Sequence, residues 1–318
     1  MKIVYTGLMM SICVISLTAC AEQETQEQKT GESEVTGEVI RFGILPAESA
    51  IPVILAEEKG FFEEEGINIE IESFSSPNDR NVAIQAKTVE GTISDVMTEA
   101  TFKKNGTDMT ITSGILEDFK ILASKQSGIT EMKELDKKKI TLVPNFILEY
   151  IMDEFAAEQD FTYEVVDIPS FATRSEALLK GEVDAAVYTE PQASMLAAQG
   201  AVVLGSSKES GINGGAIQFV DTLLSERPQD IKAFYKAYNK SIDYMNEHPA
   251  SEYTEILSKY AFPDVMSDYL DRHEEYYPYA QVVDQNLYEN IIDWTLDKNQ
   301  IEQHYTYEEL TDFSYIER

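Results

Sequence analysis

The chain has 318 residues, with 25 Lys and Arg against 57 Asp and Glu, which gives a formal net charge of −32 at pH 7. A polyanion of this size repels nucleic-acid phosphates and anionic lipid headgroups, so we exclude nucleic-acid binding and polybasic attachment to a membrane. Hydrophobic residues make up 43% of the chain, which predicts that most of it folds, while 16 Gly and 10 Pro exclude a collagen-like or low-complexity chain.

The amino terminus has the pattern of an export signal. Lys2 precedes a short apolar run that ends at Leu17-Thr18-Ala19-Cys20. The run is too short for a membrane span of about 20 residues but has the length of a signal-peptide core. Small residues before a cysteine resemble the lipobox of bacterial lipoproteins. This resemblance implies a signal peptide over residues 1–19 and a lipid on Cys20; the alternative is an uncleaved anchor with an incidental cysteine.

The chain has two cysteines, Cys13 and Cys20, so the residues after Cys20 contain no disulfide, zinc–cysteine site or cysteine nucleophile. Residues 20–38 are rich in Glu and have no aromatic side chain, which predicts a disordered acidic tether. A lipid anchor with a tether would hold the folded part outside the cytoplasm, at a cell membrane. That expectation argues against a free cytoplasmic enzyme.

The first part of the folded region alternates strands and helices. An apolar run opens it, and a strictly alternating segment, Ile67–Glu72, is typical of a half-buried strand. Pro52 suits a first helical turn, and Asn78 is expected to cap the next helix. The expected strands are 39–45, 67–72 and 91–94, and the expected helices are 52–65 and 78–87. This order predicts a parallel sheet with helices on both faces.

The same pattern then restarts, with Asn145 expected as a helix cap and Thr173-x-x-Glu176 as a capping box. The expected strands are 139–143, 165–168, 183–188 and 201–204, and the expected helices are 145–158, 173–181 and 191–200. A weak sequence similarity between Ala83–Ile93 and Ala177–Val187 supports two similar α/β lobes. From about Arg227 the chain is expected to be helical, and its many tyrosines are more typical of helix packing than of a ligand box.

Residues suited to catalysis are scarce. The three histidines, His248, His273 and His304, are far apart and fall in no H-E-x-x-H pattern, and neither a G-x-S-x-G elbow nor a P-loop is present. We therefore expect no catalytic residue, no metal and no cofactor. What remains is binding, because open parallel sheets hold ligands at the carboxyl ends of strands, beside helix N-termini.

Two segments resemble the sulfonate, nitrate and thiamine-precursor type of periplasmic solute-binding proteins. The first is IRFGILPAESAIPVILAEEKGFFEEEG at Ile40–Gly66, which follows the pattern Pro-x-x-x-A-x-x-x-G-x-F. The second is Arg174–Pro191, RSEALLKGEVDAAVYTEP, similar to R-x-x-x-L-x-x-G-x-V-D-A-x-x-x-x-E-P. The closing helices around Trp294 also look like those of the family. The resemblance covers about the whole folded part.

The resemblance implies a two-lobed α/β fold of the periplasmic-binding-protein type II class, in which each lobe is a mostly parallel sheet flanked by helices and the ligand lies between them. It implies residues 39–122 and 210–318 for lobe I and 123–209 for lobe II, with crossings near Phe119–Ser124 and Ser210–Phe219. Gly214-Gly215 is expected to serve as a hinge. The implied partners are a small-molecule ligand and the permease and ATPase subunits of an ABC importer; we expect a monomer.

Two departures from the family matter. Where the family often has a turn glycine in A-x-x-A-G-x-x-D, this chain has Lys87. The histidine and cysteine motifs of fungal thiamine-pyrimidine synthases are also absent, which argues against synthase activity. The remaining alternatives are a secreted enzyme on the same fold and a sensory lipoprotein.

The candidate ligand-binding residues lie at the expected strand ends and helix starts. Phe74 and Tyr188 could stack on a heteroaromatic ring, Asp95 or Glu190 could accept its N–H groups, and Arg174 would favour a sulfonate or nitrate. The scarcity of basic residues near these loops slightly favours a heteroaromatic or cationic ligand, such as a thiamine pyrimidine precursor. The full set is Ser49, Phe74, Ser76, Asp95, Asn145, Phe146, Arg174, Tyr188, Glu190 and Asn213.

Overall fold

The computed structural model describes residues 34–115, 117–272 and 276–316. These residues belong to one compact unit that covers residues 33–318. The expected signal peptide, Cys20, most of the expected tether and His273 lie outside the described residues. In the ranges that are described, no helix is long and apolar enough to cross a membrane.

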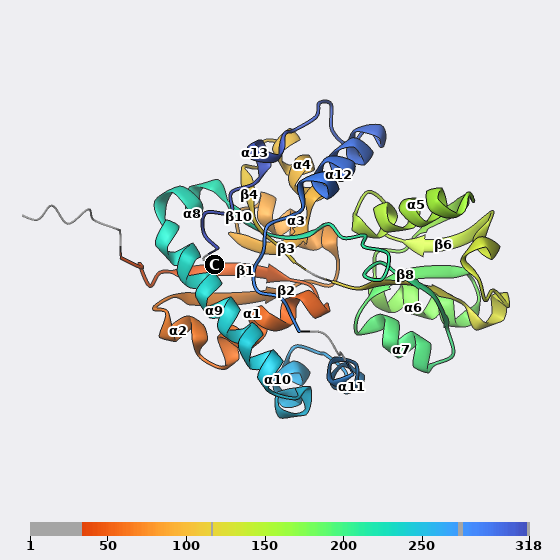
Figure 1. Cartoon of the computed structure of the whole chain (residues 1–318), viewed down its shortest axis with the longest axis horizontal. Coiled ribbons are helices and arrows are strands. Elements are labelled where there is room, and N and C mark those ends of the chain that lie inside the picture. The colour runs from red at the N-terminus through yellow and green to blue at the C-terminus, as the bar shows by residue number, and fades with distance from the viewer. Residues whose placement is uncertain (1–33, 116, 273–275, 317–318) are drawn as a thin grey trace, which may run out of the picture. The chain divides into compact units, whose positions relative to one another are not determined.

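The first sheet has five strands in the order β2-β1-β3-β10-β4 (Figure 1). Their bounds are β1 Val39–Ile44, β2 Asn68–Ser73, β3 Gly91–Asp95, β4 Met109–Gly114 and β10 Gly215–Val220. β1 pairs in parallel with both β2 and β3, whereas β10 lies antiparallel between β3 and β4. The sheet is therefore parallel except for one strand that comes from much later in the chain.

The second sheet repeats this plan in the order β7-β6-β8-β5-β9. Its strands are β5 Phe119–Ala123, β6 Lys138–Leu142, β7 Tyr163–Asp167, β8 Ala185–Thr189 and β9 Val202–Ser206. β6 is parallel to β7 and β8, while β5 is antiparallel to β8 and β9. Each sheet thus contains one reversed strand, and in each case it is the strand through which the chain enters from the other sheet.

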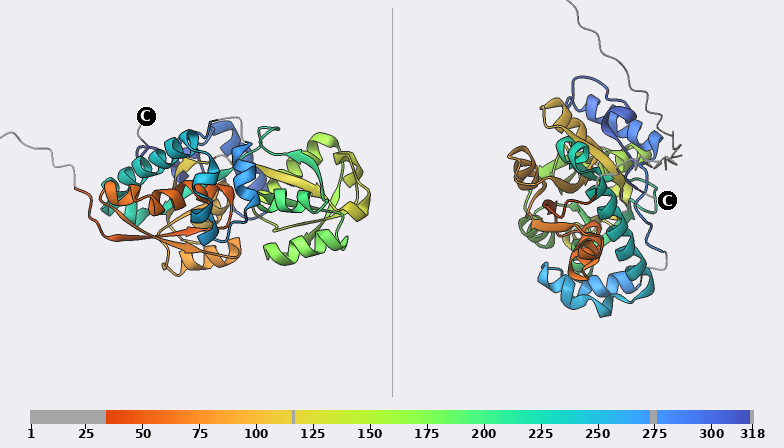
Figure 2. Two further views of the ribbon diagram at one scale, coloured as in Figure 1. Left: turned by 90° about the horizontal axis from the view of Figure 1, so that it is seen from below. Right: turned by 90° about the vertical axis from the view of Figure 1, so that its left-hand side faces the viewer.

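Helices cover both faces of each sheet (Figures 1 and 2). Their bounds are α1 Ile51–Glu58, α2 Phe61–Glu64, α3 Pro77–Gln85, α4 Val96–Lys104, α5 Ile147–Gln159, α6 Phe171–Lys180, α7 Gln192–Ala198, α8 Asp221–Glu226, α9 Pro228–Glu247, α10 Thr254–Lys259, α11 Val265–Asp271, α12 Gln285–Asp297 and α13 Tyr307–Leu310. One apolar core joins α1 and α9 to the first sheet. A second is continuous from α4 and α12 to α5 and the second sheet, so the two sheets share buried apolar surface.

The expected strands of both halves are confirmed, with ends that differ by at most two residues. The helix expected over 52–65 is instead divided into α1 and α2, because Gly60 between them has a left-handed φ of 76°. Three expected caps are also wrong. Ser76, Phe146 and Ser170 occupy the cap positions assigned to Asn78, Asn145 and Thr173.

Local chemistry explains the shifted caps. Ser76 Oγ accepts a hydrogen bond from Asp79 N at 3.2 Å, and Pro77 fits the first helical position because its missing N–H has no partner to lose. Asn145 has a φ of 68°, which places it in a turn, and its N–H donates to Glu149 at 2.6 Å. A capping box of Thr306 and Glu309 starts α13.

Lys87 stands where the family pattern often has a turn glycine. It ends α3 with a left-handed φ of 59°, and its N–H donates to Ile84 O at 2.9 Å. A glycine would adopt this conformation without steric cost, whereas a side chain resists it. Lys87 therefore carries backbone strain at this turn.

The chain crosses between the sheets twice, after β4 and after β9. The division made from the sequence placed most of Phe119–Ala123 in lobe I, but that segment is β5 and pairs only with strands of the second sheet. We propose that the lobe boundaries lie in the two crossings.

Gly214 and Gly215 lie at the end of the return crossing, and neither has a positive φ. The neighbouring side chains leave no room for a larger residue, because a Cβ on Gly214 would lie 2.7 Å from Ile147 and 2.8 Å from Ile291.

The last residues of the expected tether are attached to the folded part. Thr36 N and Oγ1 donate to the two carboxylate oxygens of Asp230 at 2.8 and 2.6 Å. Arg227 donates to Glu38 O at 2.6 Å. Residues 36–38 therefore lie against the start of α9, which the glutamate-rich composition did not predict.

Gly91 provides the space in which the aromatic core of the first sheet forms. Strand register places Phe42 and Phe219 on either side of it, and their ring centroids are 5.7 Å apart. A Cβ on Gly91 would lie 2.4 Å from the Phe219 ring and 2.8 Å from that of Phe42.

We predict that Gly91→Ala lowers the free energy of unfolding by about 1–3 kcal/mol, because the added methyl overpacks two buried rings. Denaturant unfolding measures this. Gly43→Ala in neighbouring β1 is the matched control, since its nearest contact would be 3.1 Å and its loss should be smaller. Equal losses in both variants would contradict the prediction.

Candidate functional site

A cavity lies where strand ends of both sheets meet; we call it the cleft cavity. Its volume is about 70 Å³, several times what one water molecule needs. Leu45, Asp95, Val143 and Thr189 reach it from the carboxyl ends of β1, β3, β6 and β8. The remaining lining residues are Ala47, Ser49, Pro77, Arg80, Ile93, Ser94, Glu117, Phe119, Phe146, Ile147, Leu148, Phe171, Arg174 and Gly215. This is the position in which open α/β sheets bind ligands.

Two buried arginines reach the cleft cavity from opposite sides. Arg80 lies on α3, beside the first sheet, and Arg174 lies on α6, beside the second. Arg80 donates to Ile93 O and to Ser94 Oγ, each at 2.8 Å. Burial lowers the pKa of Arg80 to about 10, with Asp95 opposing the shift, so the side chain stays charged at pH 7.

Two carboxyl groups also line this cavity. Asp95 caps α4, with Oδ1 accepting from Thr98 N at 2.8 Å. Burial raises the pKa of Asp95, and the nearby Arg80 opposes the rise. Glu117 accepts from Thr189 Oγ1 at 2.7 Å, and burial raises the pKa of Glu117 to about 7. Near neutral pH, Glu117 can therefore serve as a hydrogen-bond donor or as an acceptor.

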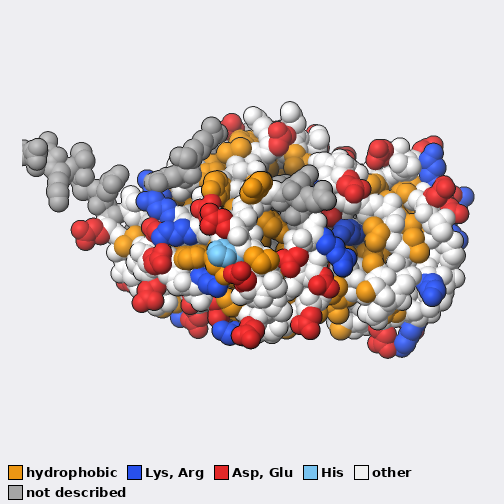
Figure 3. Space-filling model, turned by 60° about the horizontal axis from the view of Figure 1, so that its bottom comes forward, with side chains coloured by type: hydrophobic (Ala, Val, Ile, Leu, Met, Phe, Trp, Pro, Cys, Tyr) orange, Lys and Arg blue, Asp and Glu red, His pale blue; other side chains and the backbone are white. Residues whose placement is uncertain are grey.

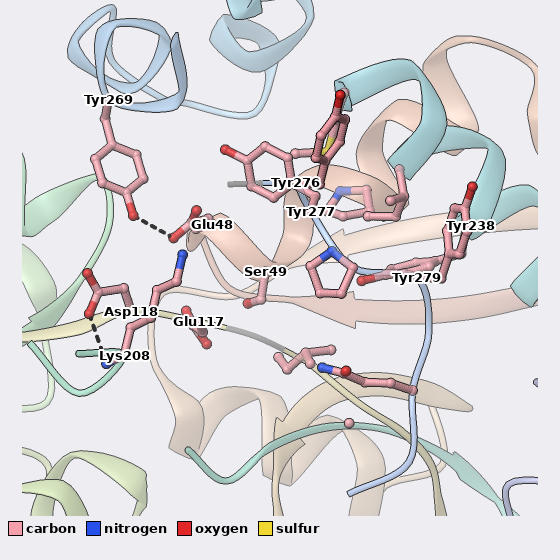
Figure 4. A pocket seen from close by; sticks show the side chains of 17 residues that line it. Glu48, Ser49, Glu117, Asp118, Lys208, Tyr238, Tyr269, Tyr276, Tyr277 and Tyr279 are labelled. Carbon is pink, nitrogen blue, oxygen red and sulfur yellow. Dashed lines mark hydrogen bonds between the residues drawn. The ribbon is translucent and has the colours of Figure 1, made fainter. Parts of the chain in front are cut away.

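A second cavity, of about 60 Å³, adjoins the first and shares Ser49 and Glu117 with it; we call it the tyrosine cavity. Figure 4 shows Tyr269 beside Glu48 and Asp118 at one end of it and the other labelled tyrosines toward the opposite end. The tyrosines are Tyr238, Tyr269, Tyr276, Tyr277 and Tyr279, and the acids are Glu48, Glu117 and Asp118. Lys208 also lines the cavity, and in Figure 4 its side chain extends toward Glu48.

Buried charges beside the tyrosine cavity form one network. Glu190 is fully buried, accepts from Lys120 Nζ at 2.6 Å and from Ser194 N at 2.9 Å, and so caps α7. Lys120 also lies 4.8 Å from the centre of the Tyr269 ring, whose hydroxyl donates to Glu48 at 3.2 Å. Burial raises the pKa of Glu48 to about 8, and the nearby Glu117 adds to the rise.

Direct contacts join the segments that carry the two sheets. Near the cavities, Glu48 N donates to Glu190 O at 3.0 Å, and Gln192 Nε2 donates to Pro46 O at 3.1 Å. From α12, Trp294 Nε1 donates to Asp153 of α5 at 2.9 Å, and Lys298, just after α12, pairs with Glu149 at 2.7 Å. The cleft cavity therefore lies between lobes that touch at several points.

Of the residues expected to bind ligand, Ser49, Asp95, Phe146 and Arg174 line the cleft cavity. Asn145 lines a separate cavity with Phe146. The others line none of these three cavities. Phe74 packs against the small core around Ile84, and Ser76 caps α3.

The side chains of Tyr188, Glu190 and Asn213 form hydrogen bonds with other residues of the protein instead. The Tyr188 hydroxyl is hydrogen-bonded to Ser175 at 2.9 Å and donates to Phe171 O at 3.1 Å. Glu190 binds Lys120, and Asn213 Nδ2 donates to Ile115 O at 2.7 Å.

Sequence reasoning missed Arg80, Glu117, Phe119 and Phe171. Arg80 is the one basic residue within α3, and a polar helix with a single arginine gives no sign that the arginine is buried. Glu117 lies in a crossing, and in a chain with so many acidic residues one more glutamate gives no sequence signal of a binding site.

His248 and His304 line neither cavity. His248 lies 3.0 Å from Glu252, and His304 lies 2.9 Å from Glu289. Over the ranges that the structure describes, no three His, Cys, Asp or Glu side chains are grouped so that they could hold a metal ion.

A protein-family model described as NMT1/THI5 like matches residues 48–252. The chain belongs to this family. The NMT1/THI5-like chain is 26% identical over 234 residues to the 4-amino-5-hydroxymethyl-2-methylpyrimidine phosphate synthase THI13 of Saccharomyces cerevisiae, covering 67% of this chain and 68% of the synthase. It is 22% identical over 287 residues to the putative binding protein YtlA of Bacillus subtilis, covering 84% and 81% of the two chains.

Solved structures show the fold. The alkanesulfonate-binding protein SsuA of Xanthomonas axonopodis pv. citri has a TM-score of 0.75 at 14% identity, covering 88% of this chain and 99% of SsuA. The nitrate-binding protein NrtA of Synechocystis has a TM-score of 0.67 at 15% identity, covering 84% and 82%. The expected periplasmic-binding-protein fold and the resemblance to its sulfonate and nitrate branch are confirmed.

The buried Glu48 makes stability depend on pH in a defined direction. Its pKa is about 8 in the folded protein and near 4.5 when exposed, so the folded state keeps a proton that the unfolded chain releases between these values. The free energy of unfolding should therefore fall as pH rises through this window, by up to about 1.4 kcal/mol per pH unit.

We predict that Glu48→Gln flattens this fall, as measured by denaturant unfolding between about pH 5 and pH 8. Tyr269→Phe removes a hydrogen bond that favours the ionised carboxylate, so it should extend the fall to higher pH. A pH dependence that is the same in wild type and Glu48→Gln would contradict the assignment.

Proposed function

We propose that the protein is the substrate-binding component of an ABC importer and captures a small organic solute in the cleft cavity. The observation that carries this proposal is that strand ends of both sheets converge on one cavity between touching lobes. Membership of the NMT1/THI5-like family and the fold shared with sulfonate- and nitrate-binding proteins support it. Permease and ATPase subunits would be its partners.

The cavity chemistry suits a flat heteroaromatic ligand with polar substituents. Phe119, Phe146 and Phe171 offer aromatic surface, and Asp95 and Glu117 offer groups that could bind an amino substituent. A thiamine pyrimidine precursor has this chemistry, and relatives are named for an aminopyrimidine phosphate. A sulfonate-type anion is the second ligand class, and the two arginines favour it.

We predict that 4-amino-5-hydroxymethyl-2-methylpyrimidine or an alkanesulfonate raises the melting temperature. A ligand at 100 times its Kd adds about 2.7 kcal/mol of stability. Phe146→Ala should weaken the Kd, measured by calorimetry, by about tenfold, because it removes stacking surface from the cavity. Phe74→Ala is the matched control: this half-buried ring lies outside the cavity, so the variant should lose stability and keep the Kd. Equal Kd values in wild type and Phe146→Ala would remove Phe146 from the site.

The second candidate function is enzymatic, because several relatives are named as synthases. Mass spectrometry of the ligand after incubation with the protein separates the two. An importer component returns the ligand unchanged, whereas an enzyme alters its mass.

We also propose that Cys20 carries a lipid that anchors the protein outside the cytoplasm, on the strength of Leu17-Thr18-Ala19-Cys20. Mass spectrometry of the mature amino terminus should find a lipid-modified Cys20. Cys20→Ser should release the protein from the membrane fraction, while Cys13→Ser should leave the mature protein unchanged. A mature chain that retains residues 1–19 would contradict this proposal.

A further inference from the structure

Arg174 is a fully buried cation whose hydrogen-bonding capacity the described protein does not use up. It is 0% exposed and lines the cleft cavity. One terminal nitrogen donates to Ile168 O at 3.3 Å, but Nε has no hydrogen-bond partner among the described residues. Among the described residues Arg174 forms no ion pair, and Asp167 is the carboxylate whose charge acts on it, from beyond contact distance.

Two aromatic rings hold the guanidinium in place. Its carbon lies 4.6 Å from the centre of the Tyr188 ring and 5.0 Å from that of Phe171. The Tyr188 ring is itself fixed, since its hydroxyl donates to Phe171 O. Stacking favours a charged guanidinium and orients its planar fork, but it gives Nε–H no acceptor among the described residues.

Arg80, in the same cavity, is in the opposite situation. Its Nε and one terminal nitrogen donate to Asn81 Oδ1 at 3.1 and 2.9 Å, in addition to its bonds to Ile93 and Ser94. Asp95 also provides a nearby negative charge. The protein therefore provides acceptors for Nε and both terminal nitrogens of Arg80, whereas Arg174 keeps an unpartnered Nε and has only the more distant charge of Asp167.

A buried charge that no carboxylate contacts directly is unfavourable, and a water molecule can accept an N–H without neutralising it. We propose that Arg174 is the anion-binding end of the cleft cavity and that the ligand carries a carboxylate, sulfonate or phosphate group bound by its guanidinium. The inference rests on the proposed function, because it names the chemistry of the solute captured there. It gives the ligand two ends: an anion at Arg174, and a body among Phe119, Phe146 and Glu117.

Nitrogen-15 NMR of the whole protein labelled on arginine tests this directly. The Nε–H signal of Arg174 is assigned by its loss in Arg174→Lys. The probes are two matched pairs: 4-amino-5-hydroxymethyl-2-methylpyrimidine with its phosphate ester, and butanol with butanesulfonate. We expect at least one anion to shift the Arg174 signal and its neutral partner to leave it in place, while the Arg80 signal moves less.

Calorimetry then measures the preference. The anionic member of the responding pair should bind at least tenfold more tightly than its neutral partner. Arg174→Gln should abolish that preference, and Arg174→Lys should keep part of it, because lysine retains the charge without the fork. If Arg174→Gln does not fold, the wild-type titration still decides.

The inference is overturned if no anion shifts the Arg174 signal, or if a bound anion retains its advantage in Arg174→Gln. These outcomes are distinct from failure of the proposed function. A neutral pyrimidine that binds without an anionic preference would preserve solute binding while removing the anion site.

Discussion

The structure depends on the hydrogen bonding between the two crossings that join the sheets. At one end, Asn213 Nδ2 donates to Ile115 O at 2.7 Å, and Ile115 N donates to Gly215 O at 3.1 Å. At the other, Ser207 and Phe119 exchange two bonds, Ser207 N to Phe119 O at 2.8 Å and Phe119 N to Ser207 Oγ at 2.9 Å. Because the crossings are paired side by side, each sheet receives its reversed strand in a fixed register. The carboxyl ends of the parallel strands are thereby brought to the same cavity.

The charges inside the cleft act separately from those on the surface. The chain carries a net charge of −32, and Figure 3 shows acidic side chains scattered over the face in view rather than gathered in one patch. Surface charges of this kind are screened by salt over about 10 Å, so they exert little force inside the cleft. The field there is set by Arg80, Arg174, Asp95 and Glu117. An acidic protein can therefore present a local environment suited to an anion.

Glu117 connects the two cavities chemically as well as spatially. It lies in the first crossing, lines both cavities and accepts a hydrogen bond from Thr189 at the end of β8. Glu48 and Glu190 extend the buried acids on the tyrosine side, where Lys120 pairs with Glu190. The hydrogen-bond partners of Glu117 are Ser49 and Thr189, which come from segments beside different sheets. Glu117 thus belongs both to the candidate site and to the crossing that connects the lobes.

The sequence by itself determined the repeated α/β plan, since apolar runs and strict alternation such as Ile67–Glu72 report burial directly. It also led to Ser49, Asp95, Phe146 and Arg174, because residues after a strand and before a helix lie at the ligand-binding edge of such a sheet. Only the tertiary structure decided which of these face the cavity. Tyr188 and Glu190 have the same local signature, yet Tyr188 supports Arg174 and Glu190 caps α7. Arg80 and Glu117 enter the site because segments distant in the chain pack around them, and burial produced by such packing leaves no local pattern in an acidic, polar stretch of sequence.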